Sequence, residues 1–210
     1  MSPAAQTRFV ALLRGINLGS RNRVPMAKLR ELSEALGFTD VGTYIASGNV
    51  VLTSREGSKA VASRLEAAIE KEFGFSIVVM ILTGADLAKV VKDNPFPRAA
   101  PNTVHVAFAA RSIDKTDADR LTKLEVLPEG VAVRGRLIYL HLPNGYGRSG
   151  LAGEVSRVKV PTTVRNWRTI TALNEMAAAP EDQDMKFHTA IKQGDKTATG
   201  IQIPDDVIGP

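Results

Sequence analysis

The chain has 210 residues, of which 44% are hydrophobic and 23% are charged; these values are ordinary for globular proteins and exclude a chain that is disordered throughout. It contains no cysteine, which excludes disulfide and thiolate chemistry and favours a cytoplasmic location. No run approaches the roughly 18 apolar residues that a membrane-spanning helix needs, so no membrane partner is expected.

The charge of the protein is unevenly distributed along the chain. Of its 27 basic and 22 acidic residues, three basic and six acidic residues lie in 180–210. Residues 1–179 therefore hold 24 basic and 16 acidic residues, a net charge of +8. Such a basic body favours anionic partners such as nucleotides, nucleic acid or acidic metabolites, although a solvated basic surface accounts for the same charge. Aromatic residues make up only 5%, which disfavours a platform for stacked bases.

Residues 1–94 predict a ferredoxin-like subdomain. A helix that opens at Pro25-Met26 and ends at Gly37 follows the first strand, and a helix from Ser58 to Gly74, with apolar residues at every fourth position, precedes the last. Runs rich in β-forming residues predict four strands, at Arg8–Leu13, Val41–Ala46, Val50–Ser54 and Phe75–Leu82. This order, strand, helix, strand, strand, helix, strand, is typical of a four-stranded antiparallel sheet with two helices on one face.

Residues 95–179 predict a second subdomain. Just before it, Thr83-Gly84-Ala85-Asp86 predicts a capping box for a short helix, and Pro95, Pro97 and Pro101 mark the boundary. A strand, a helix, a hairpin and two helices are expected to follow, at Thr103–Ala110, Asp114–Leu124, Val131–Leu142, Ser149 onward and Thr163–Ala178. The predicted fold class is therefore α+β, with a second α/β sandwich that repeats the first less completely. In the tail, 180–210, alternation around Gly194-Asp195 predicts a short β-hairpin that docks on the body or stays mobile.

The first candidate binding segment is the polar block between the first strand and the first helix. Gly15 and Gly19 can adopt positive φ angles and let a ligand approach the backbone. Arg14 can donate two parallel hydrogen bonds to a carboxylate or phosphate, and the carboxamides of Asn17 and Asn22 both donate and accept. The block lacks the ending of a P-loop and the third glycine of a dinucleotide fingerprint. The alternative is that the arginine pairs with an internal acid while the asparagines cap turns.

Two further polar segments complete the candidate site. In Ser47-Gly48-Asn49, the asparagine is either an ordinary turn residue or, if it lies within the following strand, a residue near the second subdomain. Thr162 or Thr163 is expected to cap a helix, leaving free N–H groups beside Arg165 and Arg168. The turn that contains Arg148 is expected to face the same cleft.

Catalytic residues stay unassigned, and neither a metal nor a cofactor is predicted. The three histidines are isolated in sequence, and no metal-binding HExxH pattern or GxSxG nucleophile elbow is present. A serine, a histidine and an acid that meet only in space would escape this test.

At these blocks the chain resembles the bacterial domain-of-unknown-function family 1697, over about residues 7–178. The resemblance departs at Ser20, where a second glycine is usual, and in one extra residue between the paired threonines and Arg165. It implies an α+β fold with a ferredoxin-like part and implies no activity. From Met185 to Ile208 the tail resembles the opening strands of family 1905, cut short. The matching pieces for family 1697 are Leu12–Gly19, Asn22 with Met26, Leu36–Phe38, Tyr44–Val50 and Thr162–Thr169.

Three hypotheses follow for the function. The first is a protein that binds a nucleotide, nucleic acid or another anion in a cleft between the subdomains, lined by Arg14, Asn17, Asn49, Arg165 and Asn166. The second is an enzyme of unknown reaction that uses the same cleft, and the third is an interaction module whose motif residues are purely structural. Convergence of these side chains on one pocket would favour the first two, whereas burial among internal partners would favour the third. No oligomeric state is predicted.

Overall fold

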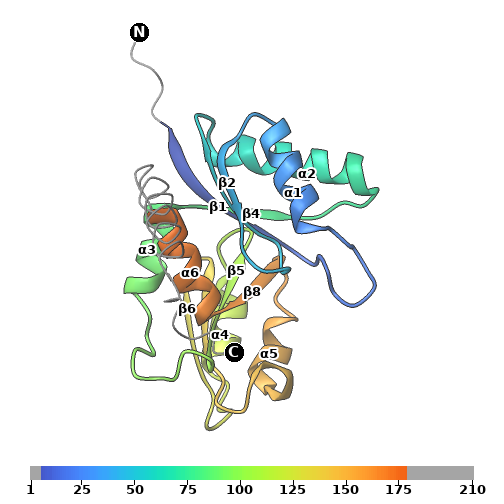
Figure 1. Cartoon of the computed structure of the whole chain (residues 1–210). Coiled ribbons are helices and arrows are strands. Elements are labelled where there is room, and N and C mark those ends of the chain that lie inside the picture. Colours follow the sequence, from blue (N-terminus) through green and yellow to red (C-terminus); the bar gives the residue numbers. More distant parts are fainter. Residues whose placement is uncertain (1–5, 179–210) are drawn as a thin grey trace, which may run out of the picture. The chain divides into compact units, whose positions relative to one another are not determined.

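The computed structural model describes residues 6–178, and its first four strands form one antiparallel sheet. The order across this sheet is β2-β3-β1-β4, and the helices α1 (Met26–Ala35) and α2 (Ser58–Phe73) cover one face (Figure 1). The strands are β1 (Thr7–Leu13), β2 (Thr39–Thr43), β3 (Asn49–Ser54) and β4 (Val79–Thr83). The predicted ferredoxin-like order is therefore confirmed, and we call this part the first unit.

The second sheet repeats the first strand for strand. Its order, β6-β7-β5-β8, has the same pattern as the first sheet when the strands are numbered within each sheet. Helices α4 (Lys115–Thr122) and α5 (Gly150–Val155) cover one face, and a short 3-10 turn, η1 (Tyr146–Arg148), precedes α5. The strands are β5 (Val104–Ala109), β6 (Gly130–Arg134), β7 (Leu137–His141) and β8 (Thr162–Asn166). This second unit is therefore a complete βαββαβ arrangement, more regular than the sequence predicted.

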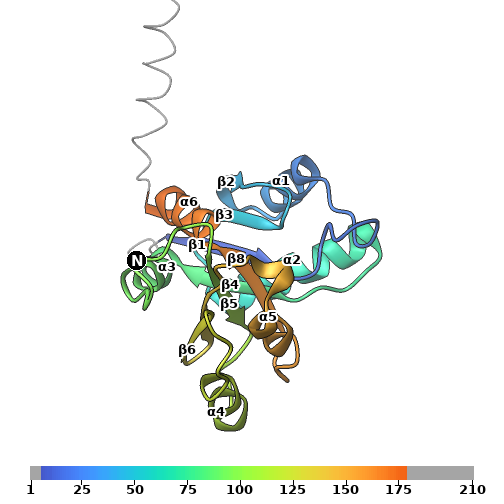
Figure 2. The same cartoon turned by 90° about the horizontal axis from the view of Figure 1, so that it is seen from below.

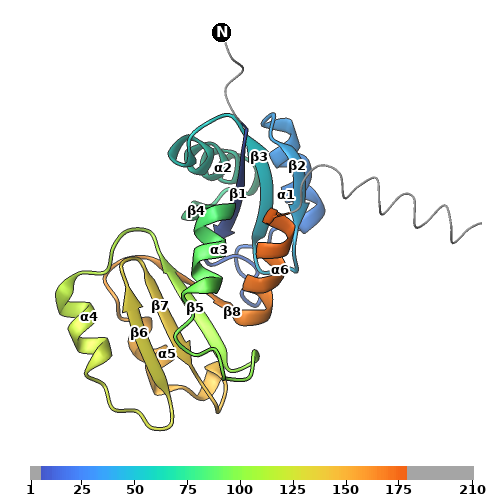
Figure 3. The same ribbon diagram turned by 90° about the vertical axis from the view of Figure 1, so that its left-hand side faces the viewer.

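A third helix follows the last strand of each unit, and these two helices lie between the sheets. They are α3 (Gly84–Lys92) and α6 (Trp167–Ala178), which lie side by side in Figures 1 and 3. Seen from below, α6 lies beside β2 and β3 (Figure 2). The two elements are in close contact: a Cβ added to Gly42 of β2 would lie only 3.0 Å from the methyl carbon of Met176 in α6. The central layer thus belongs to both units.

Three hydrophobic clusters fill the spaces between these layers. The outer two lie between each sheet and its own pair of helices. The central cluster joins Val10 and Leu12 of β1 to Phe108 of β5 through the apolar faces of α3 and α6. Because side chains alternate across a strand, β1 can supply both the outer and the central cluster and is buried on both faces.

Capping residues, glycines and prolines predicted most helix ends correctly. The main error concerns the start of the helix after Pro161. The capping box is present: Thr83 accepts from the N–H of Asp86, whose carboxylate accepts from the N–H of Thr83. The prediction that Thr163 lies in a helix is wrong, because Thr162–Asn166 is the strand β8, paired along its length with β5. The helix begins only at Trp167.

Two predicted strands were also misplaced at their ends. β2 ends at Thr43, so the segment Tyr44–Ala46 belongs to the turn, and β4 begins at Val79 rather than at Phe75. Apolar residues in both segments pack against the core from irregular backbone, which the run of hydrophobic letters does not reveal. The hairpin predicted in 180–210 lies outside the described residues.

Candidate functional site

The side chain of Arg165 joins the two units at a buried junction. It projects from β8, and only 7% of the residue is exposed. Its Nε donates to the side-chain oxygen of Asn49 at 2.5 Å, and Asn49 is the first residue of β3. Its two Nη groups donate to the carbonyls of Leu13, Ser47 and Gly48, to the hydroxyl of Thr163 and to the carbonyl of Val164. Six acceptors therefore share the five N–H groups of one guanidinium.

This junction holds a positive charge among neutral partners. No carboxylate of residues 6–178 forms a salt bridge with Arg165. Burial lowers the pKa of its guanidinium to about 10. Because a buried donor or acceptor without a partner is costly, the full set of hydrogen bonds is what allows the group to be buried. All of these contacts are internal, so the junction fastens β8 of the second unit to β1 and β3 of the first.

Backbone geometry explains why Gly48 precedes Asn49. Gly48 has a φ of +76°, and a Cβ there would lie 2.8 Å from the side chains of both Leu13 and Ile16. The turn before β3 lies at the same end of the sheet as the loop after β1, because Leu12 pairs with Asn49 in the antiparallel ladder. Of the two placements that the sequence left open for Asn49, the structure has the one within the following strand, since Asn49 is the first residue of β3.

The asparagines of the first polar block fold the loop onto itself. Asn17 and Asn22 both have positive φ angles, as Gly15 and Gly19 do. The carboxamide of Asn17 donates to the carbonyls of Val24 and Ala46 and accepts from the N–H of Val24. Asn22 donates to the carbonyl of Gly15. These side chains do what turn-forming asparagines do, since they replace backbone partners that an irregular segment lacks.

The remaining predicted site residues lie at different places around β8. Asn166 accepts from the N–H of Thr169 and so caps α6, the role that the sequence assigned to the threonines. Arg14 is exposed and donates through Nε to the carbonyl of Thr162 at the start of β8. Arg148 is exposed in η1, two residues after Tyr146. The centroid of the Tyr146 ring lies 5.4 Å from that of His105, and His105 pairs with Asn166, the last residue of β8. Arg14 and Arg148 thus lie toward opposite ends of this strand.

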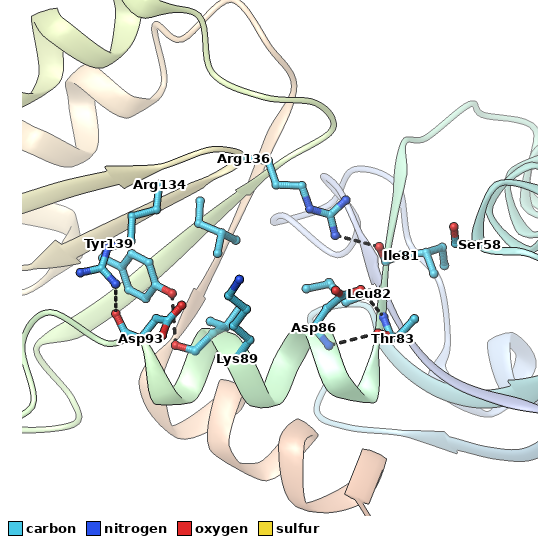
Figure 4. Close-up of a pocket in the computed structure, with 12 residues that line it drawn as sticks. Ser58, Ile81, Leu82, Thr83, Asp86, Lys89, Asp93, Arg134, Arg136 and Tyr139 are labelled. Atoms are coloured by element: carbon cyan, nitrogen blue, oxygen red, sulfur yellow. Dashed lines mark hydrogen bonds between the residues drawn. The ribbon is translucent and has the colours of Figure 1, made fainter.

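A pocket between the two units lies elsewhere. Its volume is about 520 Å³, and it is lined by β4 and α3 of the first unit and by the β6–β7 hairpin of the second (Figure 4). None of the side chains predicted to bind a ligand lines it. Its charged lining residues are Asp86, Lys89, Asp93, Arg134 and Arg136.

Backbone contacts hold the arginines of the hairpin in place. Arg136 donates through Nη2 to the carbonyl of Ile81 in β4 at 2.9 Å, and Arg134 donates through Nη1 to the carbonyl of Asp93 at 2.7 Å. The guanidinium of Arg134 also lies 5.8 Å from the ring centroid of Tyr139. In Figure 4, Lys89 points from α3 toward the hairpin that carries both arginines. The pocket therefore combines cations from both units.

Tyr139 lines this pocket with a phenol whose pKa is raised. Its side chain is fully buried, and its hydroxyl donates to the carbonyl of Val90 in α3 at 3.1 Å. Burial raises the pKa of its phenol from 10 to about 12, with the charge of Asp93 acting in the same direction. Unfolded chains lose this proton first, so the free energy of unfolding is expected to fall as the pH rises from about 10 to about 12. Following tyrosinate absorbance in the wild type and in Tyr139→Phe checks this, because the variant should lack the phenol that titrates last.

Lys89, Arg134 and Arg136 were not among the residues that the sequence predicted to bind a ligand. The one available signal was the pair of arginines that flank Gly135, at the turn of the predicted hairpin. Lys89 gave no signal because it looks like any exposed lysine of an amphipathic helix. Which residues face it across the pocket depends on how the units pack, and that is a non-local property.

None of the helices within 6–178 is both long enough and apolar enough to cross a bilayer. No group of three or more histidine, cysteine or acidic side chains that could hold a metal ion is found in the same part of the chain.

Comparison with known proteins identifies the family of the chain and confirms the fold. None of the curated proteins matches the chain. Among solved structures, the conserved bacterial protein SP0830 from Streptococcus pneumoniae is similar, with a TM-score of 0.70 over 82% of this chain and 99% of that chain. At 24% identity, this likeness shows the shared fold. The family model described as "Protein of unknown function (DUF1697)" matches residues 6–139, which is more than half of the sequence. The chain therefore belongs to the DUF1697 family.

Proposed function

We propose that this protein binds a small anionic ligand in the pocket between its two units. The observation that carries the proposal is that three cationic side chains, Lys89 from the first unit and Arg134 and Arg136 from the second, line one pocket. The lining also holds two acidic side chains, Asp86 and Asp93, so three positive and two negative charges leave a net charge of +1. An excess of positive charge in a concave site favours an anion.

The dimensions and lining of the pocket suit a small molecule. A volume of about 520 Å³ lies within the range of about 300–1,000 Å³ that is common for ligand sites. Apolar side chains such as Leu82, Val90 and Leu137 line it together with the cations. The supported class is a phosphate- or carboxylate-bearing molecule with an apolar portion, such as a nucleotide or an acidic metabolite.

The cations are partly held in place before a ligand arrives. One N–H of Arg136 is used by Ile81 and one of Arg134 by Asp93, so each guanidinium is fixed in direction, while its other N–H groups make no hydrogen bond to residues 6–178. Such preorganisation lowers the entropy lost on binding. Lys89, a compact charge on a flexible stem, can follow the position of the anion.

The direct test is a binding screen with a matched lysine control. Thermal shift and calorimetry with nucleotides, phosphosugars and di- and tricarboxylates should show an increase in the Tm of the wild-type protein with at least one class. Lys89→Ala is expected to weaken that binding about 10-fold or more, because a hydrogen bond to a charged group contributes roughly 1.5–3 kcal/mol. Lys92→Ala, on the same helix but outside the pocket lining, is expected to bind as the wild type does.

Two outcomes would contradict the proposal. One is the absence of any Tm increase across the whole panel. The other is an equal loss of affinity in Lys89→Ala and Lys92→Ala, which would indicate attraction to the general charge of the protein and not to this pocket.

A further inference from the structure

The loop between β1 and α1 carries positive charge that no described carboxylate neutralises. We call Arg14–Val24 the arginine loop. Arg14, Arg21 and Arg23 are all exposed, and none forms a salt bridge within residues 6–178. The first acidic residue of the sequence is Glu31, so the whole segment before it holds only basic charges.

The arginine loop is held in one conformation by its own hydrogen bonds. The backbone N–H of Asn17 donates to the carbonyl of Asn22, and the Asn17 side chain makes the contacts to Val24 and Ala46 described above. Ile16 and Val24 are buried at its two ends. The loop therefore presents its arginines from a fixed frame, which reduces the entropy cost of binding.

Arg14 is positioned to bind a phosphate. Its Nε is held by the carbonyl of Thr162 at 3.0 Å, while its Nη groups make no hydrogen bond to residues 6–178. A guanidinium anchored in this way directs two parallel donors outward, the arrangement that fits two oxygens of one phosphate.

Exposed apolar side chains lie next to these cations. Leu18 is 69% exposed at the tip of the loop, and Ile45 is 53% exposed in the turn that Asn17 ties to the loop through Ala46. Ile45 also has a φ of +46°, a strained conformation for a β-branched residue that persists only where the surroundings enforce it. A rigid surface with arginines and isolated apolar side chains can contact both the phosphates and the unstacked bases of a nucleic-acid strand.

We infer that the arginine loop, together with Ile45, binds single-stranded nucleic acid through its phosphate backbone. Three arginines from a fixed loop match a polymer that carries one phosphate per nucleotide, and the exposed Leu18 and Ile45 match base faces that only an unpaired strand exposes. This site is separate from the pocket of the proposed function, and neither inference rests on the other.

Fluorescence anisotropy with labelled oligouridylate and oligothymidylate tests this inference. The wild-type protein should bind with an affinity that falls steeply with salt. The double variant Arg21→Gln/Arg23→Gln should bind about 10-fold more weakly or worse, and its slope of log K against log salt should be smaller by about 1.4, at roughly 0.7 per phosphate contact. Neither side chain makes a hydrogen bond within residues 6–178, so the Tm should stay unchanged.

The control removes the same charge elsewhere. Arg98→Gln/Arg111→Gln changes two exposed arginines that form no salt bridge within the described residues and lie in loops of the second unit, and it should bind as the wild type does. Equal losses in both double variants, tighter binding of a duplex than of a single strand, or preferential binding to vesicles that contain anionic lipid would each overturn the inference. So would the absence of oligonucleotide binding by the wild type at low salt.

Discussion

Replacing Arg165 by alanine is expected to lower the Tm of the protein by about 10 °C. The substitution leaves the side-chain oxygen of Asn49 and the carbonyls of Leu13 and Ser47 without the N–H groups that donate to them, whereas the carbonyl of Gly48 keeps the N–H of Leu13. An unsatisfied buried polar group costs roughly 1–3 kcal/mol, and water that enters the vacated space recovers part of this, so we expect a loss of about 4 kcal/mol. For a protein of this size each kcal/mol corresponds to roughly 2–4 °C.

Two companion variants make this result specific. Arg168→Ala removes an exposed arginine from the first turn of α6 and should leave the Tm within about 1–2 °C of the wild-type value, since surface substitutions change stability by about 0.5 kcal/mol or less. Arg165→Lys keeps the charge but offers three donors in place of five, so its Tm should lie between those of the other two. Thermal unfolding followed by circular dichroism measures all three. Equal melting temperatures for Arg165→Ala and Arg168→Ala would show that the junction does not hold the units together.

The same experiment separates the two roles that the sequence left open for Arg165. A ligand-binding arginine would lose ligand affinity on substitution while the fold stayed intact. A structural arginine loses stability first, and the internal partners of all its N–H groups support that second role. The exposed Arg14, by contrast, keeps donors available to solvent.

Interactions between residues close in the sequence made the first unit predictable. The helix α2 was identified because Val61, Leu65 and Ile69 recur on one face, and all three are buried. The start of α3 was identified because a capping box is a local exchange of hydrogen bonds between residues three positions apart. Such features depend only on residues that are close in the sequence, so they can be recognised from the sequence alone.

The prediction for the segment from Thr162 to Asn166 was wrong because its structure depends on residues far away in the sequence. Val164, Trp167, Ile170 and Leu173 recur every three residues, which favours a helix through all of them. The structure divides them between β8 and α6, because the β-branched stretch completes the second sheet beside β5. Pairing with a strand more than fifty residues earlier in the sequence overrides the local preference, as is common for β-strands.

The candidate site shows the same division between local and non-local information. The sequence indicated which polar side chains are unusual, and Asn49 and Arg165 do meet. It contained no information on burial, so a solvent-filled hollow was expected where the structure has a closed junction. The pocket escaped notice because Lys89 and Arg136 come together only through the packing of one unit on the other.

Replacing Phe108 by alanine should produce the other large effect, because this side chain fills the layer shared by both units. Phe108 is 1% exposed on β5 and belongs to the cluster that also contains Leu12 of β1 and Ile170 of α6. Deleting a buried phenylalanine side chain costs about 3–5 kcal/mol, from lost burial and from the cavity left behind. We expect one unfolding transition at a lower temperature.

Hydrogen exchange shows whether the two units really share this layer. If they do, Phe108→Ala, although it lies in the second sheet, should lower the protection of amides in β1 and β3 as much as in β5 and β7, since the whole central cluster loosens. Leu121→Ala provides the comparison, because Leu121 lies in the outer cluster of the second unit, away from the first sheet. It should lower protection mainly in the second sheet. Wild-type protection of β1 in Phe108→Ala would mean that the units are stable independently, and the Arg165 junction would then be a contact between separate domains.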